Sequence, residues 1–252
     1  RRRSRGECVG VLALLAGLGA SCGDTARVTD ASRVTDASRA GESSPRKEAA
    51  KKPESPAANG SLPAPERRGG PSLHRVLDGR RSQRDLGGDA LSPQKIGQLL
   101  WAAQGITGRH GRRTAPSAGA LYPLEVTLVA ADGVHRYRPR DHDLERIANE
   151  DRRGELESAC LGQRFVGAAP AAFVIGAEIA RTARKYGERA ERYATLEAGA
   201  AAQNLLLEAE ALGLGAVWVG AFDDDRVRAA AGLPPAVTPY AVIPVGTAAS
   251  DG

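Results

Sequence analysis

The chain has few cysteines, few aromatic residues and no long apolar run. Only 3 of its 252 residues are cysteine, which excludes a scaffold held together by disulfides. Cys160 lies in a segment of helical character, and we expect it to be a small buried hydrophobe. The aromatic residues all lie at or beyond Trp101, so residues 1–100 lack the side chains that dominate most cores. We therefore expect the folded domain in the later part of the chain.

That later part also has no excess of positive charge. Residues 1–70 hold 13 Lys and Arg against 8 Asp and Glu, whereas residues 71–252 hold 22 of each. A nucleic-acid-binding domain carries its own basic surface, so this balance argues against nucleic acid as a partner. The histidines lack the spacing of metal ligands, and we expect no metal site among His74, His110, His135 and His142.

The apolar run from Val9 to Leu18 is too short to span a bilayer and predicts an export signal instead. Several arginines precede it, and small residues follow it up to Cys22. Residues 1–22 resemble a bacterial lipoprotein signal, in which Cys22 would become the lipidated N-terminus. Cleavage that leaves a soluble secreted protein is the alternative. We expect an exported chain, lipid-anchored at a bacterial envelope membrane and touching that membrane only through its lipid.

Residues 23–70 are rich in Ser, Ala, Pro, Gly and charged side chains. They include the sequence Arg-Val-Thr-Asp-Ala-Ser twice in tandem, at Arg27–Ser32 and Arg33–Ser38. Because such a segment buries too little apolar area to offset its chain entropy, we predict a flexible tether. A solenoid is the rival interpretation, but two six-residue copies are too few for one.

The pattern changes at Pro71, and residues 71–248 are expected to form one domain. Apolar periodicity, caps and turn residues predict its elements. These are a helix that starts at Ser92-Pro93 and ends at Gly105, a strand at Glu125–Ala131 paired with Val134–Arg138 across Asp132-Gly133, a helix at Glu150–Leu161, a buried strand at Ala171–Ala177, a long helix at Thr195–Leu212, a short strand at Gly215–Gly220, a capped helix at Asp223–Ala231 and a final strand at Tyr240–Gly246. Helices and strands mix without a strict βαβ rhythm, which indicates an α+β fold with a mainly antiparallel sheet.

Three short segments carry residues suited to binding. Arg80-Arg81-Ser82-Gln83-Arg84 places three guanidinium groups and a hydroxyl within five residues, a donor set that fits phosphate oxygens. In Arg113–Pro123 the small residues of Pro116–Gly119 would let backbone approach a flat ligand closely. Val219–Asp223 would expose backbone amides where a strand ends before a helix. Each also has a plain alternative: a solvated basic turn, a Gly/Pro turn, and an ordinary strand-to-helix turn.

The order of these segments resembles the nitroreductase superfamily, specifically its SagB-type dehydrogenase branch, which forms thiazoles and oxazoles. The resemblance covers about Ser72 to Gly246. The matching pieces are Arg80–Arg84, Leu99–Gly105, Arg113–Pro123, Lys185–Gly187, Arg192–Tyr193, Leu196–Gly199, Gln203–Asn204, Leu212–Gly215 and Val219–Asp223.

The resemblance implies FMN bound at the interface of an intertwined homodimer. The arginine segment would hold the phosphate and the pyrimidine edge, the Pro116–Gly119 loop of the other subunit would line the ring, and Val219 and Gly220 would present backbone amide near flavin N5. The cofactor-binding residues are then Arg80, Arg81, Ser82, Arg84, Pro116, Ser117, Ala118, Gly119, Val219, Gly220 and Ala221. A cation near N1 and a donor at N5 would both favour flavin reduction.

In azoline-oxidising relatives an adjacent Lys-Tyr pair is taken as catalytic, which implies the same role for Lys185 and Tyr186, with Lys185 as the candidate general base. A surface lysine on a charged helix is the alternative. The chain departs from the pattern at Ala200, where many relatives carry histidine, and after Gly246, where other nitroreductases add a basic residue near the phosphate. We therefore expect Arg80 and Arg84 to supply most of the phosphate charge.

Taken together, the resemblance implies an FMN-dependent oxidoreductase that works by a ping-pong cycle. Hydride would pass between flavin N5 and a small molecule or a peptide-derived heterocycle, with a separate electron donor or acceptor completing the cycle. A flavin-binding or scaffold lipoprotein that keeps the fold without catalysis is the alternative function.

Overall fold

The computed structural model describes residues 60–248, all of which belong to one compact unit, Ala50–Gly252. The predicted export signal with Cys22 and the tether up to residue 59 lie outside the described residues. Within the described part, no helix is both long enough and apolar enough to cross a bilayer.

Eight strands form one sheet in the order β1-β5-β4-β3-β6-β8-β2, and β7 pairs with β8 at its side. Every pairing between these strands is antiparallel. The strands are β1 (Gly60–Ser61), β2 (Leu86–Gly87), β3 (Leu124–Ala130), β4 (Gly133–Arg138), β5 (Asp143–Ala148), β6 (Ala171–Ala177), β7 (Gly215–Ala216) and β8 (Thr238–Ala248). The long strands β3, β6 and β8 form the centre of this sheet.

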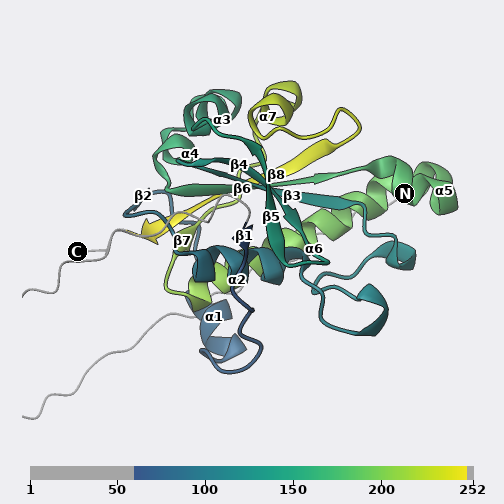
Figure 1. Cartoon of the computed structure of the whole chain (residues 1–252), viewed down its shortest axis with the longest axis horizontal. Helices are drawn as coiled ribbons and strands as arrows, with labels where there is room; N and C mark the ends of the chain where they lie inside the picture. The colour runs from purple at the N-terminus through teal and green to yellow at the C-terminus, as the bar shows by residue number, and fades with distance from the viewer. Residues whose placement is uncertain (1–59, 249–252) are drawn as a thin grey trace, which may run out of the picture. The chain divides into compact units, whose positions relative to one another are not determined.

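Helices cover both faces of the sheet (Figure 1). On one face lie α1 (Leu73–Gly79), α2 (Pro93–Gln104) and the long α6 (Ala190–Ala211). On the other face lie α3 (Arg153–Ala159), α4 (Arg164–Ala168) and α7 (Asp224–Ala230). Helix α5 (Ile179–Tyr186) follows β6 at the edge of this arrangement, and the single turns η1 (Arg109–Gly111), η2 (Ala118–Ala120) and η3 (Gly187–Arg189) connect the larger elements.

The two faces have separate cores because successive side chains of a strand point to opposite sides. Phe173 and Ile175 of β6 pack in the cluster that includes α2 and α6. Ala172 and Val174 pack in the cluster that includes α3 and α7. This arrangement of helices on an antiparallel sheet confirms the predicted α+β fold class. Cys160 is fully buried in the second cluster, as expected, and burial raises the pKa of its thiol to about 12.

Local sequence explains where two of the helices begin. The Ser92 hydroxyl accepts a hydrogen bond from the Lys95 amide at 3.3 Å, and Pro93 occupies the first helical turn of α2. The Asp223 carboxylate accepts from the Arg226 amide at 3.0 Å and caps α7 in the same way. Both starts agree with the sequence prediction.

Several predicted boundaries are corrected. Helix α6 begins at Ala190, earlier than expected, because Ala190 and Ala194 continue its buried stripe through a charged stretch. The helix expected at Glu150–Leu161 is shorter and is followed by α4, since Leu161 and Gly162 adopt positive φ and break the helix. The strand expected at Gly215–Gly220 pairs regularly only at Gly215 and Ala216, and β8 is longer than Tyr240–Gly246.

The expected tether extends to residue 70, whereas residues 60–70 in fact lie against the domain. Gly60 and Ser61 pair with Leu144 and Asp143 of β5. Leu62 is only 6% exposed and its amide donates to the His142 carbonyl at 3.1 Å. A strand edge and an apolar pocket therefore order this segment. Neither β1 nor β5 was expected from the sequence.

Candidate functional site

The predicted arginine segment follows α1 directly and lies beside β7. Ser82 forms an isolated bridge with Ala216, and the Gln83 amide donates to the Ala216 carbonyl at 3.0 Å. The Arg81 guanidinium turns back and donates to the carbonyls of Asp78 at 2.6 Å and Arg80 at 2.9 Å. Arg80 is half-buried and Arg84 is exposed, so these two guanidinium groups are the ones placed to receive an anion.

The predicted turn at Val219–Ala221 follows β7 in the chain. The Val219 amide donates to the Val242 carbonyl at 2.8 Å, so it is not free to face a ligand, and this part of the prediction is corrected. The sheet uses that amide because Val219 forms a bridge with Val242. Gly220 and Ala221 are exposed, and neither amide donates a backbone hydrogen bond among the described residues. Trp218 is 39% exposed beside them.

The Pro116–Gly119 loop lies on a different side of the domain, against the end of α5. Gly119 has φ of +61°, a conformation that favours glycine. A β-carbon at this position would lie 2.9 Å from the Tyr186 hydroxyl and 3.2 Å from Lys185 Nζ. The structure therefore brings together the small-residue loop and the predicted catalytic pair, which are separated by more than sixty positions in the sequence.

Lys185 and Tyr186 form the last turn of α5. Lys185 is exposed, and its ammonium lies 5.4 Å from the centre of the Tyr186 ring. Tyr186 in turn packs edge-to-face on Tyr193 of α6, with ring centres 5.0 Å apart. The tyrosine ring is thus held between the loop and α6, whereas the lysine stays accessible to a ligand.

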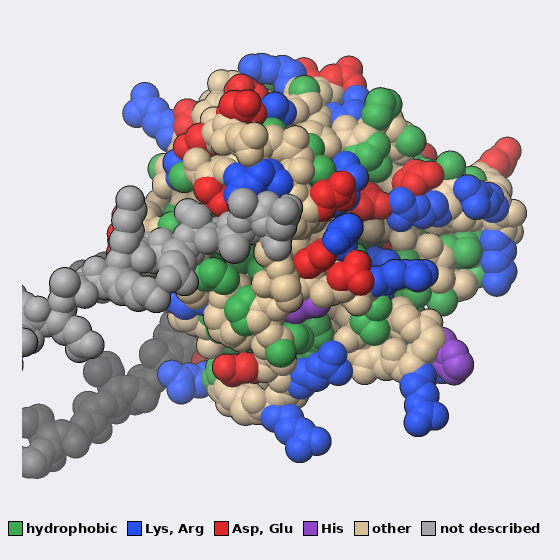
Figure 2. All heavy atoms as spheres, in the orientation of Figure 1, with side chains coloured by type: hydrophobic (Ala, Val, Ile, Leu, Met, Phe, Trp, Pro, Cys, Tyr) green, Lys and Arg blue, Asp and Glu red, His purple; other side chains and the backbone are tan. Residues whose placement is uncertain are grey.

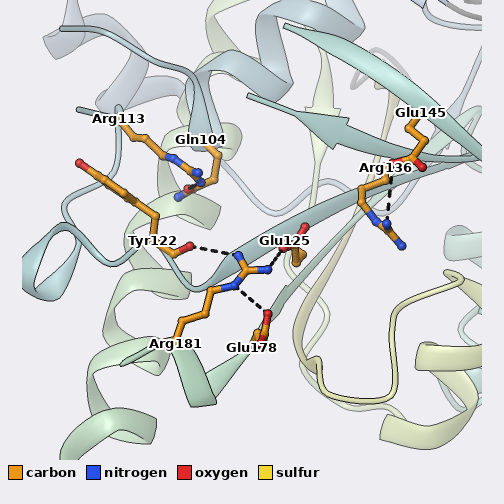
Figure 3. A network of polar contacts seen from close by, with 8 residues as sticks. All are labelled: Gln104, Arg113, Tyr122, Glu125, Arg136, Glu145, Glu178 and Arg181. Atoms are coloured by element: carbon orange, nitrogen blue, oxygen red, sulfur yellow. Dashed lines mark hydrogen bonds and ion pairs between the residues drawn. The ribbon is translucent and has the colours of Figure 1, made fainter. Parts of the chain in front are cut away.

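A polar network anchors the start of α5 (Figure 3). Arg181 donates to Glu178 at 2.7 Å, to the carboxylate of Glu125 on β3, and to the Tyr122 carbonyl at 3.4 Å. Burial opposes the charge of Arg181, but the hydrogen bond and charge of Glu125 outweigh it and raise the pKa of the guanidinium. Arg181 and Lys185 are one turn apart on α5, so this anchor also holds the helix backbone that carries Lys185.

Arg113 occupies the other side of the same network. It donates to the Gln104 side chain at 2.7 Å, and its guanidinium lies 4.6 Å from the centre of the Tyr122 ring. Burial lowers the pKa of Arg113, while the carboxyls of Glu197 and Glu125 act in the opposite direction. The basic residue that opens the Arg113–Pro123 motif is therefore an internal support for the loop.

Sequence reasoning missed Glu197, a buried carboxyl of α6 next to this loop. Only 4% of its surface is exposed. Burial raises the pKa of Glu197 to about 7, against the opposing effects of a hydrogen bond from Ser117 and the charge of Arg113. The residue stands in the stripe formed by Ala190, Ala194, Ala201 and Leu205, and this periodicity was the available signal that the carboxyl faces the core.

The two groups of predicted residues lie on opposite sides of α6. Glu197 faces Ser117, whereas a β-carbon on Gly199 would lie 4.0 Å from the indole of Trp218. Residues two positions apart on a helix point about 200° apart, so the helix itself separates the loop from the Trp218–Ala221 turn. One subunit does not bring all predicted site residues to a single cavity.

The predicted site residues also lie outside the cavity that the described domain contains. A cavity of about 440 Å³ lies between the residue 66–73 segment, α2 and α6, and none of the predicted site residues line it. Basic and acidic side chains are interspersed on the face in view (Figure 2). Within residues 60–248 no group of three or more metal-binding side chains gathers.

Comparison with known proteins identifies relatives over most of the domain. The model of the Nitroreductase family matches residues 77–247. The protein named Putative nitroreductase MJ1384 of Methanocaldococcus jannaschii is 43% identical over 162 residues, which cover 62% of this chain and 82% of that protein. The Microcin B17-processing protein McbC of Escherichia coli is 33% identical over 124 residues, which cover 44% of this chain and 46% of that protein.

Two solved structures show the same fold. A crystal structure described as a putative nitroreductase of Ralstonia eutropha has a TM-score of 0.71 and 31% identity, and the match covers 78% of this chain and 92% of that one. A second, from Desulfovibrio desulfuricans, is described as a putative nitroreductase in complex with FMN; its TM-score is 0.54, with 24% identity over 71% of this chain and 88% of that one. At this identity the second likeness concerns the fold alone.

Proposed function

Because the chain belongs to the nitroreductase family, we propose that it is an FMN-dependent oxidoreductase that binds its flavin between two copies of itself. Bound FMN would accept and return hydride at N5 in a ping-pong cycle. The observation that carries this proposal is the bridge between Ser82 and Ala216, which joins the arginine segment to β7, and the chain continues from β7 to the exposed Gly220. The phosphate donors and the backbone donor for the ring would therefore come from adjoining stretches of the chain.

The chain's own residues fit this cofactor. Arg80 and Arg84 would bind the phosphate, because the Arg81 guanidinium is occupied by the carbonyls of Asp78 and Arg80. Gly220 would donate its amide toward the ring, and Ser82 would add a hydroxyl. Gly119 has a left-handed backbone, and its lack of a side chain lets Lys185 and Tyr186 lie against the loop that would line the ring.

The homodimer is part of this proposal. Helix α6 separates the Pro116–Gly119 loop from the Trp218–Ala221 turn within one subunit. A flavin that touches both groups must therefore receive the loop from a second copy. This geometry supports the two-subunit site expected from the resemblance, and it would link cofactor binding to dimerisation.

For the substrate we propose the chemistry of the SagB-type branch, in which an azoline ring is oxidised to an azole. The 33% identity with McbC over 124 residues supports this branch, together with the accessible Lys185 beside Tyr186. Lys185 would remove a proton from the substrate carbon as hydride leaves toward the flavin. Tyr186, fixed between Gly119 and Tyr193, would orient the ring that loses these two hydrogens.

A non-catalytic flavin-binding or scaffold protein is the second candidate. It is favoured by Ala200, which stands where many relatives carry histidine. The two candidates differ in one observable, because only the enzyme undergoes reduction of its flavin by a substrate. Both require that the protein bind FMN.

Arg80→Ala and Arg84→Ala should each weaken FMN binding by about tenfold or more, because a hydrogen bond between charged groups contributes about 1.5–3 kcal/mol. The measurement is an equilibrium titration of the apoprotein with FMN, followed by quenching of flavin fluorescence. Arg140→Ala is the matched control, because Arg140 is an exposed arginine in the β4–β5 turn. Equal affinities for all four proteins would show that the phosphate lies elsewhere.

Gly119→Val should lower flavin occupancy far more than it lowers stability. A side chain there enters the space beside Tyr186 and Lys185 and also requires an unfavourable φ, which costs about 1 kcal/mol. Thermal unfolding of the apoprotein and FMN titration separate the two effects. The control is Gly154→Val in α3, whose β-carbon would meet nothing within 4 Å. Full FMN affinity in Gly119→Val would mean that the loop does not face the cofactor.

A further inference from the structure

Residues 62–67, which we call the strap, lie across one face of α2 and precede α1 in the chain. The pairing of β1 with β5 comes just before the strap, and Gly69 and Gly70 come just after it. Leu62 is the only buried residue of the strap. Because it buries so little apolar surface, the strap depends on polar contacts for its position.

The face of α2 that meets the strap is distinct from its core face. Gln94, Gly97, Gln98 and Trp101 have the spacing i, i+3, i+4 and i+7, so they share one side of the helix. The opposite side packs in the first core cluster through Ile96, Leu99, Leu100 and Ala103. Helix α2 therefore has a second face, and this face receives the strap.

Gln98 binds the backbone of the strap through both ends of its amide. Its Oε1 accepts the Glu66 N–H at 2.8 Å, and its Nε2 donates to the Glu66 carbonyl at 3.0 Å. Gln94 donates to the Ala64 carbonyl at 3.4 Å. Gln98 is only 5% exposed, so a buried amide has both of its polar groups satisfied by one residue of the strap.

Gly97 allows the strap to approach the helix closely. A β-carbon at this position would lie 3.3 Å from the Leu62 β-carbon, 3.4 Å from His142 Nε2 and 3.5 Å from the Pro63 carbonyl oxygen. Glycine is less favourable than alanine in the interior of a helix. The close approach of the strap gives a physical reason for glycine in the middle of α2.

His142, in the turn between β4 and β5, holds the start of the strap. Its carbonyl accepts the Leu62 N–H at 3.1 Å, and its Nε2 lies 3.0 Å from the Pro63 carbonyl oxygen. Because a carbonyl only accepts, Nε2 carries the proton of this bond. The other ring nitrogen lies 2.9 Å from the Tyr137 hydroxyl, which fixes the orientation of the ring.

The end of the strap forms one wall of the cavity between α2 and α6. Glu66 and Arg67 line this cavity together with Trp101 of α2 and Leu207 of α6. The Arg67 guanidinium lies 5.9 Å from the centre of the Trp101 ring and donates to the Ile106 carbonyl at 3.1 Å. If the strap left α2, the cavity would lose this wall.

The two glycines after the strap are suited to act as a hinge. Gly69 and Gly70 have φ of +91° and +75°, and a β-carbon at either position would meet nothing within 4 Å. Glycine enters this region of φ without strain, and no packed neighbour holds these two residues. The backbone can therefore change direction here while α1 stays in place.

We propose that the strap is a detachable element of the fold. It docks on the second face of α2, is held there by Gln98 and His142, and moves about Gly69 and Gly70. Its docking completes the cavity between α2 and α6. The strap contains none of the residues assigned to the flavin, so this proposal stands apart from the proposed function.

Hydrogen–deuterium exchange of the full chain, followed residue by residue by NMR, tests the detachment. After correction for intrinsic rates, the Leu62 and Glu66 amides should exchange at least about 100-fold faster than the amides of β6, because they are exposed by a local opening. Equal rates in the strap and in β6 would overturn the proposal, since the strap would then open only when the whole domain unfolds. Amides as fast as those of an unstructured chain would show that the strap does not dock.

Two variants test the contacts that hold the strap. Gln98→Met keeps the side-chain volume and removes both bonds to Glu66, and Gly97→Val places a side chain beneath Leu62. Each should accelerate exchange of the Glu66 amide at least about tenfold and leave the β6 amides unchanged. The controls are Gln203→Met, on the exposed surface of α6, and Gly154→Val, whose β-carbon meets nothing within 4 Å. Equal acceleration in the strap and in β6 would indicate a general packing role and contradict the proposal.

Trp101 reports the state of the cavity wall. The chain has two tryptophans, so Trp218→Phe leaves Trp101 as the single fluorophore of this kind. In this background the Gly97→Val/Gln98→Met double variant should give strap amides that exchange as in an unstructured chain, and acrylamide should quench Trp101 more strongly. Strap amides that stay protected in the double variant would show that other contacts hold the strap. Unprotected amides with unchanged quenching would refute the claim that docking completes the cavity.

Discussion

Lys185→Ala should slow substrate-dependent flavin reduction by about 10²–10⁴-fold, the range expected when a general base is removed. FMN affinity and protein stability should remain unchanged, because the Lys185 side chain is exposed and its ammonium lies over the Tyr186 ring rather than in an ion pair among the described residues. The lysine is nevertheless well placed, since Arg181 anchors α5 one turn earlier and Tyr186 is packed against Tyr193.

The measurement is the anaerobic loss of flavin absorbance after mixing with a thiazoline-containing peptide. Arg184→Ala is the matched control, because Arg184 is the exposed cation next to Lys185. Dithionite, which needs no proton abstraction from carbon, should reduce the flavin of both variants equally. A Lys185→Ala protein that is reduced by the peptide at the normal rate would exclude the lysine as the base.

Glu197→Gln should change how stability depends on pH. The folded chain raises the pKa of Glu197 from an ordinary value of 4.5 to about 7. The stability from its neutral form is therefore complete below about pH 4.5 and is lost as pH rises through about 7. Above that pH the folded chain carries a buried ionised carboxyl, at a cost on the order of 3 kcal/mol. Glutamine does not titrate and avoids this cost.

Urea unfolding of both proteins at about pH 4.5 and about pH 8 measures the effect. The free energy of unfolding of Glu197→Gln, relative to the unmodified protein, should rise by on the order of 3 kcal/mol between these two pH values. The m-values should not change, since the surface exposed on unfolding is the same. A difference that is constant with pH would mean that Glu197 titrates normally in the folded protein.

Local signals predicted much of the fold from the sequence. Ser92, Pro93 and Gly105 mark both ends of α2, and the alternation through β3 and β4 identifies a hairpin across Gly133. The pairing of β1 with β5 was missed because it joins residues more than eighty positions apart, which no local pattern records. The start of α6 was misplaced for a related reason: packing of Ala190 and Ala194 extends a helix through residues whose charges indicate a loop.

Candidate site residues can be chosen from the sequence, but their arrangement in space cannot. No local pattern in the sequence shows that the Val219 amide donates to the Val242 carbonyl, or that the Arg81 guanidinium donates to the Asp78 carbonyl. Both facts depend on where the backbone of another segment lies. Glu197 was missed because a glutamate on a helix is usually solvated, and only its place in an alanine stripe indicates that it is buried.

The most direct test of the central claim is FMN reconstitution of the purified protein followed by anaerobic reduction. The protein should be a yellow homodimer that binds FMN in a ratio of one per subunit. The thiazoline peptide should bleach this flavin, and oxygen should restore the colour. Flavin that binds but is never reduced by the peptide, NADH or NADPH would favour the non-catalytic alternative. Protein that cannot be reconstituted with FMN would contradict both candidate functions, because each requires bound flavin.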